Sequence, residues 1–272
     1  GRSLLRDYLN LDSRIRRFLT GEVSQGRYSR RAGPIKPDLS FVGSHCVVVE
    51  KAMRALHQRN PRMSYQTVNV GSWAGLTAMM LREADLAGIH ILDESKARYN
   101  ASLLSRYGLS HRCSLVRGYN RQQCLMVRKG NPKRIRGIED LLRRDVKLAN
   151  RNVGSGTRML LDLKLSELAR DRGSDFDVLT RKIRGYDSEM MTHAQVADAV
   201  ASRKADVGVG LTSVAAEMGL DFVPLADERY DFLVEKRVRN PHVRNFLTIL
   251  ASKHFQNQVN ATTQGITFSR ET

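Results

Sequence analysis

From Phe41 onward, the chain alternates short apolar runs with longer segments whose apolar residues recur at helical spacing. The apolar runs are "SYQTVNVG", "ADLAGIHIL", "RCSLVRGY", "QQCLMVRKG", "DVKLAN", "ADVGVGL" and "DFVPL". The segments between them predict helices over residues 45–57, 73–82, 137–142, 157–171 and 193–203. Strands that alternate with helices in this way are typical of β-α-β units with a parallel sheet, so the sequence predicts an α/β fold.

Length and composition are those of a folded protein. With 272 residues, of which 41% are hydrophobic, the chain can bury a substantial core in two lobes or in one large domain. No run reaches the roughly 18 consecutive apolar residues of a membrane-spanning helix, and the N-terminal residues lack the apolar stretch of a secretory signal. The three cysteines, Cys46, Cys113 and Cys124, are odd in number and lack metal-ligand spacing. We therefore expect no membrane partner, and a reduced, cytoplasmic setting.

The chain is strongly basic, with a net charge of +17 and a pI of about 10.3. Such a charge suits a polyanionic partner, although general basicity is the simpler interpretation. Residues 1–38 hold nine Lys or Arg against four Asp or Glu, which leaves +12 spread over the remainder. This distribution argues against a single nucleic-acid-binding arm. We interpret residues 1–38 as an amphipathic helix that ends near Gly21, followed by an exposed basic linker, "RYSRRAGPIK".

Four predicted strand-to-helix turns begin their helices with a small hydroxyl residue. They are Ser44 after Gly43, Ser72 after Gly71, the run Gly154, Ser155, Gly156 and Thr157, and Thr192 with Gln195 as its capping-box partner. Open α/β sheets bind ligands at the carboxyl ends of their strands. A helix start offers free backbone N–H groups and glycine allows close approach, so each turn can hold a carboxylate or an inorganic oxyanion. Any one turn alone is more simply an N-cap, but four together favour a binding cleft.

Three histidines, His45, His90 and His193, fall at strand–helix junctions. If they converge, they can bind a metal or donate hydrogen bonds to an anion, whereas a single histidine is more often structural. Arg151 and Arg158 flank the glycine turn, where an arginine can donate two parallel hydrogen bonds to an anion or form a surface ion pair.

Two aromatic residues complete the candidates. Trp73 and Tyr230 can line a pocket or complete a core.

Nucleotide and hydrolase signatures are absent: the sequence has no P-loop, no G-x-G-x-x-G after the first strand, no G-x-S-x-G and no H-E-x-x-H. Only the histidines and Asp93 offer acid–base chemistry. We expect neither a cofactor nor a resident metal, and no catalysis.

Ordered motifs between residues 39 and 250 carry a resemblance to a known family. They are "VGSH", "NVGSWAGLTAM", "EADLAGIHILDE", "GNPKRIRGIEDL", "NRNVGSGTRMLLD", "MTHAQVADAVASRKADVGVGL" and "DFVPLADERYDF". Together they resemble the PBP-like domain family, a cytoplasmic branch of the type II periplasmic-binding-protein fold. The resemblance implies two α/β lobes that close on a small ligand and are joined by two crossover strands, near residues 115–120 and 210–222.

The resemblance also implies a division of the chain and a set of ligand-binding residues. Residues 39–117 and 218–272 form the first lobe, residues 118–217 form the second, and residues 1–38 precede both. Ser44, Ser72, Ser155 and Thr192 match positions from which such folds hold an anion. The same motifs contribute further candidates: His45, His90, Arg151, Gly156, Thr157, Arg158, His193 and Tyr230.

Members of this family are typically joined to a helix-turn-helix DNA-binding domain or to a molybdopterin-biosynthesis enzyme, and are described as molybdate-binding-like. We therefore expect a non-catalytic sensor of a small anion such as molybdate or tungstate, within a transcriptional regulator or a molybdenum-cofactor-related protein. DNA, through a domain outside this chain, and a second copy of the chain are its candidate macromolecular partners. The alternatives are an extracytoplasmic solute-binding protein of an ABC transporter and an enzyme of molybdenum-cofactor metabolism.

Overall fold

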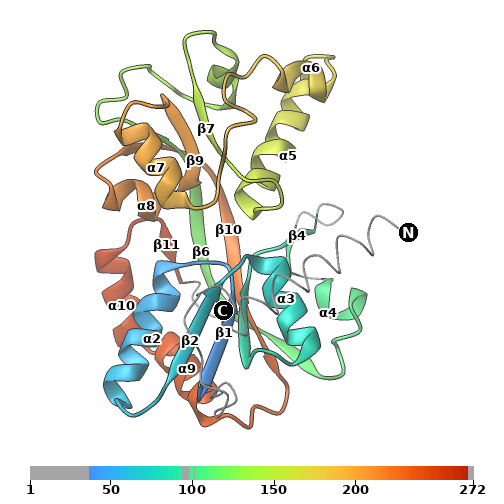
Figure 1. Ribbon diagram of the computed structural model, residues 1–272, viewed down its shortest axis with the longest axis vertical. Coiled ribbons are helices and arrows are strands. Elements are labelled where there is room, and N and C mark those ends of the chain that lie inside the picture. Colours follow the sequence, from blue (N-terminus) through green and yellow to red (C-terminus); the bar gives the residue numbers. More distant parts are fainter. Residues whose placement is uncertain (1–36, 94–97, 101, 269–272) are drawn as a thin grey trace, which may run out of the picture.

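Two α/β lobes lie end to end in a computed structural model that describes residues 37–93, 98–100 and 102–268 (Figure 1). The expected N-terminal helix and basic linker lie outside these residues. One sheet runs through both lobes in the strand order β2-β1-β3-β10-β6-β9-β7-β8, with β11 (Ile266–Thr267) paired to β6. The arrangement is a type II periplasmic-binding-protein-like fold, as the sequence predicts.

The first lobe contains the parallel strands β1 (Leu39–Gly43), β2 (Tyr65–Asn69) and β3 (Leu86–Ile89). Its helices are α2 (Val47–Arg59), α3 (Ser72–Leu81), the short α4 (Leu103–Arg106), α9 (Pro241–Ala251) and α10 (Lys253–Thr262). A two-stranded hairpin of β4 (Leu92–Asp93) and β5 (Arg98–Tyr99) follows β3. Helices α2 and α9 pack together over an aromatic core that includes Phe232 and Phe246.

The second lobe contains β7 (Leu148–Arg151), β8 (Glu189–Met190) and β9 (Val207–Leu211), with β7 parallel to both of the others. Its helices are η1 (Ile138–Leu142), α5 (Gly156–Asp171), α6 (Phe176–Thr180), α7 (His193–Ala201) and α8 (Thr212–Glu217). Figure 1 shows α5 running from the base of the second lobe, near the first, towards its far end. Its first residue, Gly156, lies against His90 of the first lobe.

Two long strands, β6 (Cys113–Val127) and β10 (Asp221–Glu235), join the lobes as an antiparallel pair. The apolar cores separate between Tyr119 and Cys124 on β6, and between Leu225 and Tyr230 on β10. The first crossover lies on the strand that contains residues 115–120. The second was placed wrongly at residues 210–222, because that segment forms the end of β9, helix α8 and only the beginning of β10.

The two runs "RCSLVRGY" and "QQCLMVRKG" were predicted as separate strands, but they form the single strand β6. Polar residues separate the two runs, yet Arg121 and Gln123 are buried inside the sheet. Glu228 of β10 pairs with Arg121 and accepts a hydrogen bond from Gln123, a long-range contact that no local pattern indicates. The same pairing extends "DFVPL" from five residues to the fifteen of β10.

The helix starts agree with the sequence at three turns and differ at one. Ser155 caps α5 through the Arg158 N–H, and Thr192 forms the expected capping box with Gln195. Helix α2 begins three residues after Ser44, with Cys46 at its N-cap, so Ser44 is not a cap. Helix α3 begins at Ser72, as predicted, with Gly71 at its N-cap.

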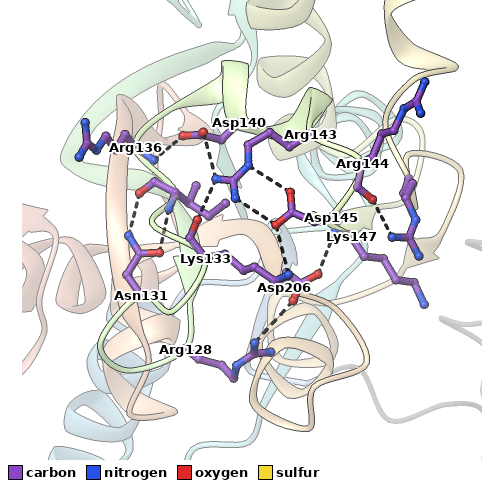
Figure 2. Close-up of polar contacts among 12 residues, drawn as sticks. Arg128, Asn131, Lys133, Arg136, Asp140, Arg143, Arg144, Asp145, Lys147 and Asp206 are labelled. Carbon is purple, nitrogen blue, oxygen red and sulfur yellow. Dashed lines mark hydrogen bonds and ion pairs between the residues drawn. The ribbon is translucent and has the colours of Figure 1, made fainter.

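The end of the second lobe remote from the first carries a network of charged side chains (Figure 2). Arg143 contacts both Asp140 and Asp145, Lys133 also contacts Asp145, and Arg128 pairs with Asp206. Hydrogen bonds from Arg143 hold the pKa of Asp145 below its usual range. Such exposed pairs stabilise a fold only weakly, so we interpret this network as a solvated charged surface.

All three cysteines are buried and free. Burial raises the pKa of the Cys124 thiol to about 12, so this group behaves as a small apolar side chain. No helix in the described part of the chain is long and apolar enough to cross a bilayer.

Replacement of Phe246 by alanine tests the core of the first lobe. Phe246 is fully buried and its ring lies 5.4 Å from that of Phe232. We expect Phe246→Ala to lower the free energy of unfolding by about 3–5 kcal/mol in urea titrations. Val178→Ala, at an exposed position, is the control. Equal, small decreases in the free energy of unfolding for both substitutions would show that the Phe246 ring does not stabilise the core.

Candidate functional site

A cavity of about 60 Å³ lies between the lobes, at the carboxyl ends of β1, β3 and β7. Its volume is far below the roughly 300 Å³ at which sites for drug-sized ligands begin. Both lobes line it: the first contributes residues such as Ser72 and Trp73, and the second contributes residues of the glycine turn. The residues of the candidate set that line it are Ser44, Ser72, His90, Arg151, Ser155, Gly156, Thr157 and His193.

Gly156 brings the lobes into contact at this cavity. A Cβ atom at position 156 would overlap the imidazole ring of His90, which belongs to the other lobe. The second lobe can therefore approach the first this closely only because residue 156 has no side chain. In this state the small cavity is largely enclosed by the two lobes.

Three hydroxyl groups around the cavity already accept a hydrogen bond from the protein. Ser72 Oγ accepts from the His90 backbone N–H at 3.0 Å, and Ser155 Oγ accepts from the Arg158 N–H at 3.2 Å. Thr157 Oγ1 accepts from Gln123 Nε2 at 3.0 Å. Because a hydroxyl has one proton to donate, these contacts leave each O–H free to donate towards a ligand.

Backbone dipoles add to this donor character. Helices α3, α5 and α7 all begin at the cavity wall, with Ser72, Gly156 and His193 as their first residues. The first backbone N–H groups of a helix have no partner within it, and the helix dipole favours negative charge there. Two lobes therefore direct helix starts at one small volume, an arrangement that suits an anion.

Arg151 supplies positive charge that no carboxylate neutralises within the described part of the chain. Its guanidinium donates to the backbone oxygens of Met190 and Met191, at 3.1 and 3.0 Å. Burial, together with the nearby Arg121, lowers the pKa of Arg151 to about 10. The side chain therefore remains charged at neutral pH, and its charge is available to a bound anion.

His193 lines the cavity, but its Nδ1 is turned away from open space. The residue is 9% exposed, and its buried Nδ1 lies beside Gly210 of β9 without a hydrogen-bond partner among the described residues. Burial, with Arg151 and Arg121 nearby, holds the pKa of His193 well below its usual range. The ring is therefore neutral at physiological pH.

A chain of buried polar groups lies beneath the cavity, where the strands cross between the lobes. Arg121 and Glu228 lie directly opposite each other on β6 and β10 and form an ion pair. Glu228 Oε2 accepts from Gln123 Nε2 at 2.7 Å and lies 3.0 Å from His90 Nδ1. On its other side, His90 Nε2 lies 2.8 Å from Ser44 Oγ.

Opposing effects set the charges of this chain. Burial alone would raise the pKa of Glu228, but Arg121 and His90 outweigh it and hold that pKa below its usual range. Burial lowers the pKa of His90, Glu228 raises it, and the net direction is downward because Arg121 and Arg151 also lower it. The chain therefore contains an ionised carboxylate and a neutral imidazole at neutral pH.

Four candidate residues lie away from the cavity. His45 is 46% exposed and contacts Glu50, so the three histidines do not converge. Arg158 pairs with Asp162 and lies over the Tyr186 ring, and Thr192 serves as a helix cap. Tyr230 is fully buried and stacks near His90, and its hydroxyl donates to the Ser44 backbone oxygen at 2.5 Å.

The sequence interpretation missed Arg121, Gln123 and Glu228. The available signal was a cluster of polar residues inside apolar runs, at "NRQQC" and "ADERYD". No group of three or more His, Cys, Asp or Glu side chains in the described ranges is arranged to hold a metal ion. The described residues instead provide hydroxyl donors, helix starts and the Arg151 guanidinium, which together can bind an anion.

Comparison with known families agrees with this geometry. The model of the PBP superfamily domain matches residues 53–251, which is most of the chain. The chain belongs to the PBP superfamily. Its relatives include the uncharacterized protein YvgK of Bacillus subtilis, 33% identical over 190 residues, which are 70% of this chain and 58% of YvgK. The matched region thus spans little more than half of that relative.

Solved structures of binding proteins share the fold of this PBP superfamily chain. A putative phosphate ABC transporter substrate-binding protein from Clostridium perfringens, with bound phosphate, has a TM-score of 0.59 and 15% identity, over 85% of this chain and 99% of that one. The sulfate-binding protein SubI of Mycobacterium tuberculosis has a TM-score of 0.58 and 13% identity, over 84% and 85%. At these identities the likeness establishes the fold alone.

The contact between Gly156 and His90 yields a direct test of closure. We expect Gly156→Ala to hold the lobes apart, because the added Cβ would overlap the imidazole. Small-angle X-ray scattering should then report a larger radius of gyration than for the unchanged chain. Gly137→Ala, whose Cβ meets only the flexible end of the Glu139 side chain, is the control. An unchanged radius for Gly156→Ala would show that this contact does not limit closure.

Proposed function

We propose that this protein binds a small tetrahedral oxyanion between its lobes and acts as a sensor of that anion. The observation that carries the proposal is the set of three hydroxyls, on Ser72, Ser155 and Thr157, that already accept hydrogen bonds and are left to donate. They come from both lobes and surround a cavity that Arg151 also lines. An oxyanion accepts hydrogen bonds on every oxygen, so it matches such a wall.

The size and charge of the cavity support an inorganic ion over a larger metabolite. About 60 Å³ is space for a few water molecules or one small ion. The charge of Arg121 is balanced by Glu228, whereas that of Arg151 is not balanced by a carboxylate in the described ranges. The phosphate-bound and sulfate-binding neighbours add support for this ligand class. Molybdate and tungstate belong to the same class of tetrahedral oxyanions.

Closure provides the mechanism of sensing. Ligand contacts from both lobes form together only when the lobes are closed, so a bound anion shifts the population towards that state. The same arrangement needs no bond to be made or broken, which favours a non-catalytic role. In a transcriptional regulator, the shift would change the position of an attached DNA-binding unit or of a second copy of the chain. We propose this role in the cytoplasm.

A second candidate is the substrate-binding protein of an ABC transporter. Its support is the likeness to the putative phosphate transporter component, which has the same two-lobed architecture. Both roles require the same anion site. They differ in what the closed form contacts, which is a regulatory domain in one case and a membrane transporter in the other.

Calorimetric titration with phosphate, sulfate and molybdate tests the anion site. We expect at least one anion to bind, and we expect Arg151→Gln to weaken that binding by about 10- to 100-fold, because hydrogen bonds to a charged group contribute about 1.5–3 kcal/mol. Arg144→Gln, at an exposed position remote from the cavity, is the matched control. Failure of all three anions to bind, or equal affinities of the two variants, would contradict the proposal.

Two variants that lack a hydroxyl test whether these groups contribute to anion binding rather than to the stability of the fold. Thr157→Val keeps the shape of the side chain and removes its O–H, while Ser155→Ala removes the other hydroxyl of the glycine turn. We expect each to weaken anion binding by about tenfold, with melting temperatures in the absence of ligand lowered by only a few degrees. Affinity that is unchanged in both variants would show that the hydroxyls do not contact the anion.

A further inference from the structure

Ser44 differs from the other three hydroxyls of the cavity. Ser72, Ser155 and Thr157 each accept a hydrogen bond from an N–H group of the protein. Ser44 Oγ instead lies 2.8 Å from a ring nitrogen of His90, which either accepts or donates according to its protonation state. The hydrogen-bonding role of Ser44 towards a ligand is therefore decided by His90.

The carboxylate of Glu228 fixes the proton on His90. His90 Nδ1 lies 3.0 Å from Glu228 Oε2, although the two atoms are not aligned as a hydrogen bond, and the side chain of Glu228 is 1% exposed. An N–H at this position is attracted to the ionised carboxylate, whereas a lone pair there is repelled by it, so the charge of Glu228 favours a proton on Nδ1. In a neutral ring, Nε2 is then an acceptor and takes the hydrogen bond from the Ser44 O–H. Ser44 consequently presents only lone pairs to the cavity.

Opposing effects from the described residues set the protonation of His90. Burial is the largest and opposes the protonated ring, Glu228 favours it, and Arg121 and Arg151 oppose it. The other described neighbours, Ser44, Ser72, Gly156 and Tyr230, are uncharged, and the nearby His193 ring is neutral. A dianion in the cavity would add negative charge and favour protonation of His90.

From this geometry we propose that the site binds its oxyanion together with one proton, which rests on the proposed anion-binding function. An ion that carries its own proton, such as hydrogen phosphate, donates that proton to Ser44 Oγ. A fully ionised ion, such as sulfate, enters only when His90 takes up a proton at Nε2. His90 then donates to Ser44 Oγ, and the Ser44 O–H turns to the anion. The site therefore selects proton-bearing oxyanions of the phosphate class.

Titration calorimetry of the whole chain with sodium phosphate and sodium sulfate, in two buffers of different ionisation enthalpy, tests this coupling. At about pH 8, sulfate binding should take up one proton, phosphate binding should take up none, and sulfate should bind at least tenfold more weakly. Between about pH 6 and 8, the affinity for sulfate should fall by up to about tenfold per pH unit. The sign follows because His90 has the higher pKa in the sulfate-bound state.

Ser44→Ala removes the group through which His90 reaches the anion. We expect phosphate to lose about tenfold in affinity, because the oxygen that accepts its proton is removed. Ser202→Ala, at an exposed position at the end of α7, should leave the affinity unchanged. Unchanged phosphate affinity in Ser44→Ala would overturn the proposal.

The outcomes separate this inference from the proposed function. Equal affinities for phosphate and sulfate at about pH 8, without proton uptake, would overturn the proton coupling and leave an anion-binding protein. Binding of neither ion would overturn both. Nitrogen-15 spectra of the ligand-free chain give an independent test, with the His90 signals identified by their loss in His90→Asn. A neutral ring with its proton on Nδ1 supports the proposal, and a proton on Nε2 contradicts it.

Discussion

The buried ion pair of Arg121 and Glu228 is the interaction on which both the architecture and the site depend. Both side chains are 1% exposed, so neither charge has solvent to compensate it. A buried pair of this kind is tolerated only when further hydrogen bonds complete it. Here the His45 backbone oxygen accepts from Arg121, while Gln123 donates to Glu228. These contacts join the two crossover strands where the apolar cores separate, and they place a carboxylate directly behind His90.

This arrangement explains how a small cavity can combine binding with closure. The strands β6 and β10 hold a fixed polar centre, while the glycine turn of the second lobe and the serine turns of the first approach it from opposite sides. Gly156 permits the approach, and the hydroxyls and helix starts supply donors only where the lobes meet. The central charges are thus internally neutralised, and Arg151 is left to set the preference for a negative ligand.

Local signals predicted much of this structure. Glycine followed by a hydroxyl residue marked the turns that line the cavity, and the capping positions of Ser155 and Thr192 follow from short-range hydrogen bonds. The α/β class and two-lobed fold could also be predicted. The second crossover could not, because β10 continues past Leu225 only by pairing with residues about 100 positions away in β6. The roles of Glu228 and His45 depend on the same long-range packing. Glu228 lies beneath the cavity beside His90, whereas the His45 side chain faces solvent.

A crystal structure of the chain with sodium arsenate tests the central claim most directly. Arsenate is a proton-bearing tetrahedral oxyanion of the phosphate class, and its arsenic atom can be located by anomalous scattering. The account predicts one strong peak between the lobes, with arsenate oxygens within hydrogen-bond distance of Ser44, Thr157 and Arg151. Arsenate bound only elsewhere, or a cavity that holds only water at saturating arsenate, would contradict it.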